Sequence, residues 1–299
     1  MPMPSTAPVG MIGLGLMGAA LSARLIDAGM ALIGFDIDAT KCRAFEATGG
    51  EAADAAGQLA TRCQSIVIAV FNAGQVMSLL DELAQNAEAN PPLLICTTTC
   101  APGEIADIAA RAARDGLPLV EAPISGTSAE VRDGAATALV AGEPAAIAAA
   151  SAVLEILCPH RMQMGKIGDA SRTKLAINLI LQNNRAALAE GIVFAESVGL
   201  DAAAFLDAAR NSAAYSRVMD SKGPKMLTRD FTPQSHIAQT LKDAELILHE
   251  ASQRNLPLPM TSTQTTLLRA AILLEGPDSD SAAVIEAIRP ARQRTGESR

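Results

Sequence analysis

The segment VGMIGLGLMG, residues 9–18, decides the fold. It begins as an apolar run typical of a buried strand and continues into a GxGxxG pattern that opens a helical stretch. In such a loop the first glycine permits a tight turn, the second lets the backbone approach a pyrophosphate, and the third lets the helix pack closely on the sheet. The N–H groups that begin the helix lie at its positive dipole end and favour phosphate. The predicted cofactor-binding residues of this loop are Gly13, Gly15, Leu16, Met17 and Gly18.

An acidic residue stands at the end of the next apolar run. Asp36 follows Gly13 by 23 residues, where a carboxylate can accept hydrogen bonds from an adenosine ribose. A 2′-phosphate at that place would meet a like charge, so Asp36 favours NAD over NADP. Asp38 is an alternative acceptor, and the nearby Lys41 and Arg43 keep NADP open as the less favoured cofactor.

Short apolar runs alternate with helix-length segments through the first half of the chain. This alternation predicts βαβ units and a parallel sheet, because parallel strands require crossover connections. Apolar positions at helical spacing then run from residue 175 to 198, which predicts one long helix of about 30 residues. The expected strands are residues 9–14, 31–35, 65–70, 93–96, 117–124, 136–140 and 162–165.

No strand pattern follows the long helix. The rest of the chain is expected to form helices separated by Gly223-Pro224, Thr232-Pro233, residues 257–259 and Gly276-Pro277. The sequence therefore predicts a Rossmann-type α/β domain followed by an all-α domain, with the long helix joining them. The expected ranges are 1–167 for an NAD-binding domain and 168–299 for a helical substrate and dimerisation domain.

Composition excludes several classes of function. A formal charge of −8 and a pI near 5.0 argue against a nucleic-acid surface, which needs clustered lysine and arginine. The longest apolar run, residues 145–154, is shorter than the ~20 residues that span a membrane. Five cysteines without a CxxC pair and three scattered histidines predict neither disulfides nor a metal site. The start of the chain lacks the pattern of a secretory signal, so we expect a soluble cytoplasmic protein.

Three further segments carry a specific resemblance. They are EAPISGT at residues 121–127, TKLAIN at residues 173–178, and the pair Lys242-Asp243. Together with the glycine loop, and in the same order, these segments resemble the β-hydroxyacid dehydrogenase family of the 6-phosphogluconate dehydrogenase superfamily. That family includes 3-hydroxyisobutyrate dehydrogenase, tartronate semialdehyde reductase and L-threonate dehydrogenase. The resemblance implies hydride transfer between NAD and a small hydroxy-carboxylate or its semialdehyde.

Lys174 and Asn178 are the expected catalytic residues. Four residues apart on the long helix, they project from one face, one turn apart. An ammonium group beside a substrate oxygen can act as general acid in reduction, and its neutral form can act as base in oxidation. Asn178 can hold the substrate oxygen or orient the lysine without adding charge. Such a lysine needs a pKa lowered by burial or by a neighbouring cation.

The resemblance and the strand ends supply the other expected site residues. Ser125, Gly126 and Thr127 resemble the family's substrate-binding segment and are expected to grip a carboxylate, because open α/β sheets bind ligands at the carboxyl ends of their strands. The resemblance also implies that Thr99 lies near the nicotinamide ribose and that Lys242 faces the cofactor. The strand-end residues expected to line the cofactor cleft are Val70, Phe71 and Asn72.

The chain departs from the family pattern in the expected substrate segment and on the long helix. Thr127 replaces a glycine, Ile177 replaces the first of two paired asparagines, and Ala129-Glu130 replaces a small Gly-Ala pair. These changes indicate a differently shaped or more polar pocket. Ser235 or His236 in place of an apolar neighbour would suit the extra hydroxyls of a four-carbon sugar acid.

Two other functions stay open at this point. An NADPH-dependent relative of the imine reductases shares the implied architecture, although Lys174 and Asp36 disfavour it. A non-catalytic dinucleotide-binding protein is the other alternative, although the Lys174 and Asn178 pair disfavours it. The largely apolar helical half and the resemblance together imply a homodimer or homotetramer.

Overall fold

The structure is a computed structural model that describes residues 7–87 and 90–290. Residues 1–6, on which the expectation about a leader peptide partly rests, lie outside the described residues. Contacts divide the chain into two compact units, Met1–Lys174 and Leu175–Arg299. Within the described ranges, no helix combines the length and apolarity needed to cross a bilayer.

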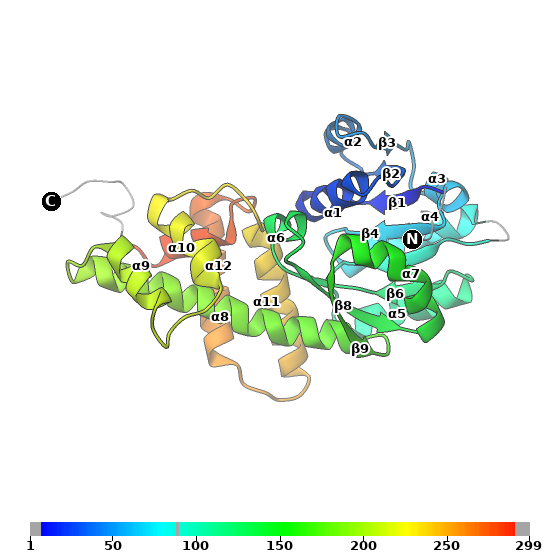
Figure 1. Ribbon diagram of the computed structural model, residues 1–299. Coiled ribbons are helices and arrows are strands. Elements are labelled where there is room, and N and C mark those ends of the chain that lie inside the picture. The colour runs from blue at the N-terminus through cyan, green and yellow to red at the C-terminus, as the bar shows by residue number, and fades with distance from the viewer. Residues whose placement is uncertain (1–6, 88–89, 291–299) are drawn as a thin grey trace. The chain divides into compact units, whose positions relative to one another are not determined.

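The first unit is built on one twisted sheet (Figure 1). Its described residues form nine strands in the order β3-β2-β1-β4-β5-β6-β8-β7, with β9 paired to β8. The order reverses between β1 and β4, which is the switch point where doubly wound sheets bind their ligands. The strands are β1 (Val9–Ile12), β2 (Leu32–Phe35), β3 (Glu51–Ala52), β4 (Ser65–Ile68), β5 (Leu93–Cys96), β6 (Leu119–Glu121), β7 (Ile124–Ser125), β8 (Thr137–Gly142) and β9 (His160–Gly165).

Helices cover both faces of this sheet. Along β1, Val9 and Met11 pack into one core and Ile12 into another, because successive strand residues point to opposite faces. The first core is shared with α1 and α7, and the second with α3, α4 and α5. The predicted Rossmann-type α/β unit is confirmed. Its helices are α1 (Leu16–Asp27), α2 (Ala39–Glu46), α3 (Gly57–Arg62), α4 (Ala73–Asn86), α5 (Pro102–Arg114), α6 (Ser128–Arg132) and α7 (Pro144–Leu157).

The far edge of the sheet differs from the prediction. The run expected as one strand over 117–124 forms β6 and β7, separated at Ala122-Pro123, and the sheet is not entirely parallel, because β8 runs antiparallel to both strands. Proline has no N–H for a ladder, but its carbonyl still pairs: Pro123 O accepts from Leu139 N at 3.0 Å. The two-residue strand β3 was not predicted, because so short an edge strand carries no alternating pattern.

The second unit is helical, as predicted, and begins within the long helix α8 (Asp169–Ser197). The predicted break at Gly223-Pro224 is wrong, because both residues lie inside α10. A Cβ at Gly223 would come within 2.8 Å of Leu206, so this glycine serves close packing between two helices. After α8 follow α9 (Ala202–Arg210), α10 (Val218–Thr228), α11 (Ile237–Ser252), α12 (Pro259–Glu275) and the 3₁₀ helix η1 (Ser281–Ala287).

Candidate active site

The three glycines of the loop after β1 are required for different reasons. Gly13 has φ +89°, and a Cβ there would lie 2.5 Å from the carbonyl oxygen of Ala69. A Cβ at Gly18 would collide with the carbonyl oxygen of Gly13. Gly15 has an ordinary φ of −68°, and no atom of the chain lies within 4 Å of the position its Cβ would take. The fold itself therefore demands Gly13 and Gly18, whereas the space beside Gly15 fits a ligand that approaches the backbone.

Helix α1 begins beside that space. Gly15 is its N-cap and has no side chain to satisfy the first N–H groups, so these groups are available to a phosphate. β1, β4 and β5 are parallel neighbours, and their carboxyl ends therefore lie along one edge of the sheet. Glycine loop, helix start and strand ends together suit the pyrophosphate of a dinucleotide.

Asp36 ties this loop to the end of β2. Its Oδ2 accepts a 2.8 Å hydrogen bond from the backbone N–H of Leu14, and its Oδ1 accepts from Asp38 N at 2.9 Å. Lys41 Nζ lies 3.6 Å from Oδ1. The carboxylate is therefore held in place by the loop that it would serve, and one cation stands beside it.

The residues after β4 and β5 are joined by a threonine hydroxyl. Thr98 Oγ1 donates to Val70 O at 3.1 Å and lies 3.2 Å from Val70 N, whereas the predicted Thr99 is half-buried at the next position. Asn72 caps α4 through a 2.9 Å bond from Gln75 N to its Oδ1. The role of Thr98 was missed, because three consecutive threonines give no signal for which one faces inward.

The expected carboxylate-binding segment forms a turn into α6. Gly126 has φ +150°, and a Cβ there would lie 2.8 Å from that of Ala136. Thr127 closes a capping box: its Oγ1 accepts from Glu130 N at 3.2 Å, and Glu130 Oε2 accepts from Thr127 N at 2.8 Å. The departures at Thr127 and Glu130 are thus explained together, as the two halves of one helix cap. Ser125 ends β7 and is half-buried.

A buried carboxylate fixes the beginning of α8. Glu121 is 1% exposed, and its two oxygens accept from Gly168 N at 2.6 Å and Ser171 N at 2.5 Å. Burial raises the pKa of Glu121, while these backbone donors act in the opposite direction. The carboxylate satisfies N–H groups at the helix start, three residues before Lys174. This role was missed, although an acid within a fully apolar run is a signal of it.

Lys174 and Asn178 are both buried on α8, at 6% and 5% exposure. Asn178 Nδ2 donates a 2.8 Å hydrogen bond to Oδ2 of the buried Asp243 on α11. Lys242 Nζ lies 3.0 Å from Oδ1 of the same carboxylate. Asp243 therefore orients the Asn178 amide and pairs with the lysine that was expected to face the cofactor.

The buried polar face of α8 continues beyond Asn178. Gln182 Nε2 donates to Thr240 O at 3.2 Å, and Gln264 Nε2 donates to Gln182 Oε1 at 3.2 Å. Arg185 Nη1 donates to Thr240 Oγ1 at 3.3 Å. Sequence patterning did not single out Gln182 or Arg185, because a polar residue on a helix normally faces solvent.

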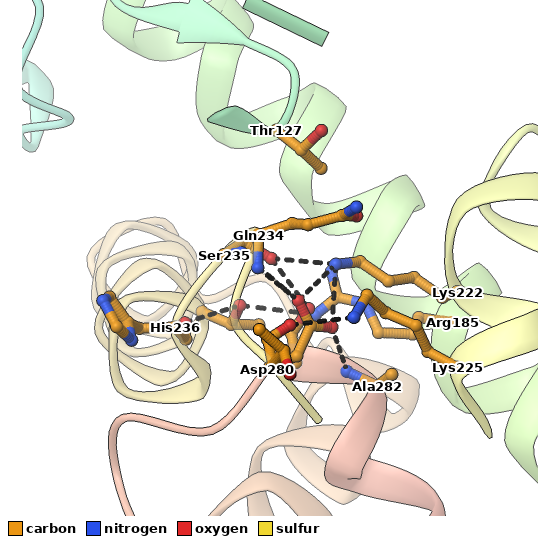
Figure 2. A network of polar contacts seen from close by, with 12 residues as sticks. Thr127, Arg185, Lys222, Lys225, Gln234, Ser235, His236, Asp280 and Ala282 are labelled. Carbon is orange, nitrogen blue, oxygen red and sulfur yellow. Dashed lines mark hydrogen bonds and ion pairs between the residues drawn. The ribbon is translucent and has the colours of Figure 1, made fainter. Parts of the chain in front are cut away.

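A second polar cluster lies where α10 and η1 meet (Figure 2). Lys222 Nζ pairs with Asp280, and Ser235 Oγ lies 3.3 Å from Lys222 Nζ and 3.0 Å from Ser281 Oγ. His236 Nδ1 lies 2.8 Å from the carbonyl oxygen of Asp278. Both residues expected to suit extra substrate hydroxyls thus have partners within the chain.

Across the described residues, no three histidine, cysteine, aspartate or glutamate side chains are placed to hold a metal ion.

Comparison with known proteins agrees with this geometry. Residues 8–165 match the family described as the NAD binding domain of 6-phosphogluconate dehydrogenase. Residues 168–288 match the family described as NAD-binding of NADP-dependent 3-hydroxyisobutyrate dehydrogenase. An L-threonate dehydrogenase from Cupriavidus necator is 29% identical over 280 residues, covering 92% of this chain and 94% of the relative.

Two further proteins share nearly the whole length. A 2-(hydroxymethyl)glutarate dehydrogenase from Eubacterium barkeri is 26% identical over 287 residues, covering 95% of both chains. The crystal structure of a 3-hydroxyisobutyrate dehydrogenase from Salmonella typhimurium matches with a TM-score of 0.86 and 26% identity, covering 94% of this chain and 99% of the other. These relatives are hydroxyacid dehydrogenases, and this chain carries their NAD(P)-binding domains. The chain belongs to the β-hydroxyacid dehydrogenase family, within the 6-phosphogluconate dehydrogenase superfamily.

Proposed function

We propose that this protein is an NAD-dependent dehydrogenase of small β-hydroxyacids, with Lys174 as its general acid and base. The observation that carries the proposal is the arrangement on α8. There Lys174 is buried one turn before Asn178, whose amide is hydrogen-bonded to a buried carboxylate. A buried lysine beside an oriented amide suits proton transfer to a substrate oxygen.

Asn178 takes a supporting role in this proposal. Because its Nδ2 donates to Asp243, its Oδ1 is the end that accepts from the substrate hydroxyl or from the Lys174 ammonium. Lys174 removes the hydroxyl proton in oxidation and returns it in reduction. Ser125, Gly126 and Thr127 bind the substrate carboxylate; the Thr127 N–H already donates to Glu130, so the Ser125 and Thr127 hydroxyls are the donors left for it.

Bound NAD supplies the hydride acceptor. The backbone of Gly15 and the first N–H groups of α1 would hold its pyrophosphate, and Asp36 would accept hydrogen bonds from its ribose. A 2′-phosphate at this place would meet a like charge on the Asp36 carboxylate, which supports NAD as the cofactor. Lys41 at 3.6 Å weakens this discrimination without reversing it, because the ion pair is partly exposed.

The decisive experiment measures NADH formation with L-threonate, D-glycerate, 3-hydroxyisobutyrate and 3-hydroxypropionate, using NADP in parallel. Lys174→Ala should lower kcat by at least ~10²-fold, the usual contribution of a general acid–base group, and leave the Kd for NAD unchanged. Lys166→Ala removes an exposed lysine shortly before α8 and serves as the matched control. Tight NAD binding without turnover of any hydroxyacid would instead favour a non-catalytic nucleotide-binding role.

A homo-oligomer is the second part of the proposal. Large apolar side chains are exposed on α8 and α12, including Phe194 at 67% and Leu273 at 88%. Large apolar side chains that are this exposed favour burial in an interface. Light scattering after size-exclusion chromatography tests this, and a mass near 30.8 kDa would contradict it.

A further inference from the structure

Arg185 is a buried cation without a paired anion. It is 5% exposed, and its Nη1 donates a 3.3 Å hydrogen bond to a neutral hydroxyl, that of Thr240. Among the described residues, no carboxylate lies within 4.0 Å of its guanidinium, and its Nε has no hydrogen-bond partner. The neighbouring cations differ, because Lys222 pairs with Asp280 and Lys242 pairs with Asp243.

A buried charge of this kind destabilises the folded state unless an anion binds to it. Burial lowers the pKa of Arg185 to about 10, against the opposing effect of Asp280 and Asp243, so the side chain stays charged near neutral pH. An isolated buried cation loses its hydration and gains no ion pair in return. Guanidinium groups in this position typically bind carboxylates through two parallel hydrogen bonds.

The nearby carboxylates are already satisfied by other groups. Asp280 accepts from Lys222 Nζ at 2.8 and 2.9 Å and from the backbone N–H groups of Gln234 and Ala282. Figure 2 shows the side chains of Arg185 and Lys222 approaching Asp280 from the same side. The Lys222 ammonium forms the ion pair with the Asp280 carboxylate, and the Arg185 guanidinium remains available for an anion from outside the chain.

Arg185 lies on the same face of α8 as the proposed substrate-binding amide. Asn178 and Arg185 are seven residues apart on α8 and therefore share one face of the helix, with Gln182 between them. Both side chains reach α11 at positions three residues apart, Asn178 at Asp243 and Arg185 at Thr240. Residues at that spacing lie about 5–6 Å from each other at Cβ. A substrate that is held by Asn178 and reaches Arg185 would run along this face, beside Gln182.

We propose that Arg185 binds a second carboxylate of the substrate, so that the preferred substrates are β-hydroxyacids with a further acid group two or three carbons from the reacting end. This inference rests on the proposed function, in which Asn178 contacts the substrate. It assigns Arg185 to substrate selection; the proton transfer remains with Lys174.

A matched set of three substrates tests the proposal. 2-(Hydroxymethyl)glutarate carries the second carboxylate, 2-(hydroxymethyl)pentanoate has a chain of the same length without it, and 3-hydroxyisobutyrate lacks the extension. The wild type should show the highest kcat/KM for the diacid. Arg185→Gln should lower kcat/KM for the diacid by about 10- to 100-fold, as expected for a hydrogen bond to a charged group, and change the two monoacids by less than ~3-fold. Arg269→Gln removes an exposed arginine and should leave the three values unchanged.

The possible outcomes distinguish the role of Arg185 from the proposed dehydrogenase function. Equal losses on all three substrates in Arg185→Gln would make the residue structural and overturn the inference. A wild type that oxidises monoacids but does not prefer the diacid would also overturn it and leave the proposed function standing. Failure with all three while NAD binds would count against the proposed function itself.

If Arg185→Gln does not fold, inhibition of the wild type by glutarate compared with butyrate gives the answer. Glutarate should inhibit at least ~10-fold more strongly, since only it has a second carboxylate for Arg185. Equal inhibition would reject the second carboxylate subsite.

Discussion

Lys222 Nζ lies 2.8 Å from Oδ1 and 2.9 Å from Oδ2 of Asp280, and the two side chains are 3% and 0% exposed (Figure 2). Asp280 also accepts from the backbone N–H of Ala282 and so caps η1. One carboxylate thus links α10 to η1 inside the helical unit. Because both side chains are buried from solvent, each one depends on the other.

Replacing the lysine should therefore be severe. Lys222→Met keeps the side-chain volume but leaves the Asp280 carboxylate buried without its cation, and we expect a loss of about 3–5 kcal/mol in the free energy of unfolding. Urea denaturation followed by circular dichroism measures this. Arg254→Met, which removes a cation 58% exposed just after α11, should cost less than ~1 kcal/mol. A loss equally small in Lys222→Met would show that the pair does not stabilise the unit.

Lys222 should also give stability a specific pH dependence. Burial lowers its pKa from 10.5 to about 8, with Asp280 acting in the opposite direction. Between pH 8 and 10.5 the unfolded chain therefore holds a proton on Lys222 that the folded chain has released. The unfolded state binds more protons there, so this residue makes stability rise with pH through that window and has a constant effect below it. The difference in unfolding free energy between wild type and Lys222→Met should increase from pH 8 to 10, and a flat or falling difference would contradict the shift.

In the glycine loop, a substitution that affects ligand binding can be distinguished from one that affects folding. Gly15→Ala should leave the melting temperature nearly unchanged, because φ is ordinary and no chain atom lies within 4 Å of the new Cβ. It should nevertheless weaken NAD binding at least ~10-fold, because the methyl group occupies space that a pyrophosphate needs. Gly18→Ala is the matched comparison and should destabilise the fold by its clash with Gly13 O. Isothermal titration with NAD measures the affinity, and thermal melts measure the stability. An unchanged affinity for NAD in Gly15→Ala would show that the pyrophosphate does not bind at this loop.

Glu121 should affect kcat indirectly, because it fixes the start of α8, the helix that carries Lys174. Glu121→Gln keeps one acceptor and turns an N–H donor toward a backbone N–H, so we expect a cost of about 1–3 kcal/mol and a lower kcat with unchanged affinity for NAD. Glu143→Gln, at the N-cap of α7 where the side chain makes no cap hydrogen bond, is the control. Loss of stability with a normal kcat would limit Glu121 to a structural role.

Local signals predicted much of this architecture. The glycine spacing at residues 13–18 and the alternation of apolar runs with helix-length segments predicted the α/β unit and the helical unit. Such predictions succeed because the periodicity of a strand or a helix can be recognised within a few neighbouring residues. Glycine and proline were less reliable as signals of where helices end. Gly223-Pro224 reads as a break, yet both residues continue α10 because the glycine lets it pack against Leu206.

The sequence by itself determined the family, the cofactor loop and the candidate pair Lys174 and Asn178, because each depends on spacings of a few residues along the chain. Only the tertiary structure decided that Asp243 orients Asn178, that Glu121 holds the start of α8, and that Arg185 is buried without a carboxylate. These partners stand 47 to 65 residues apart in the two hydrogen-bonded cases. The free energy of a buried charge depends on which groups the folded chain brings around it, and that environment is not encoded in any local pattern.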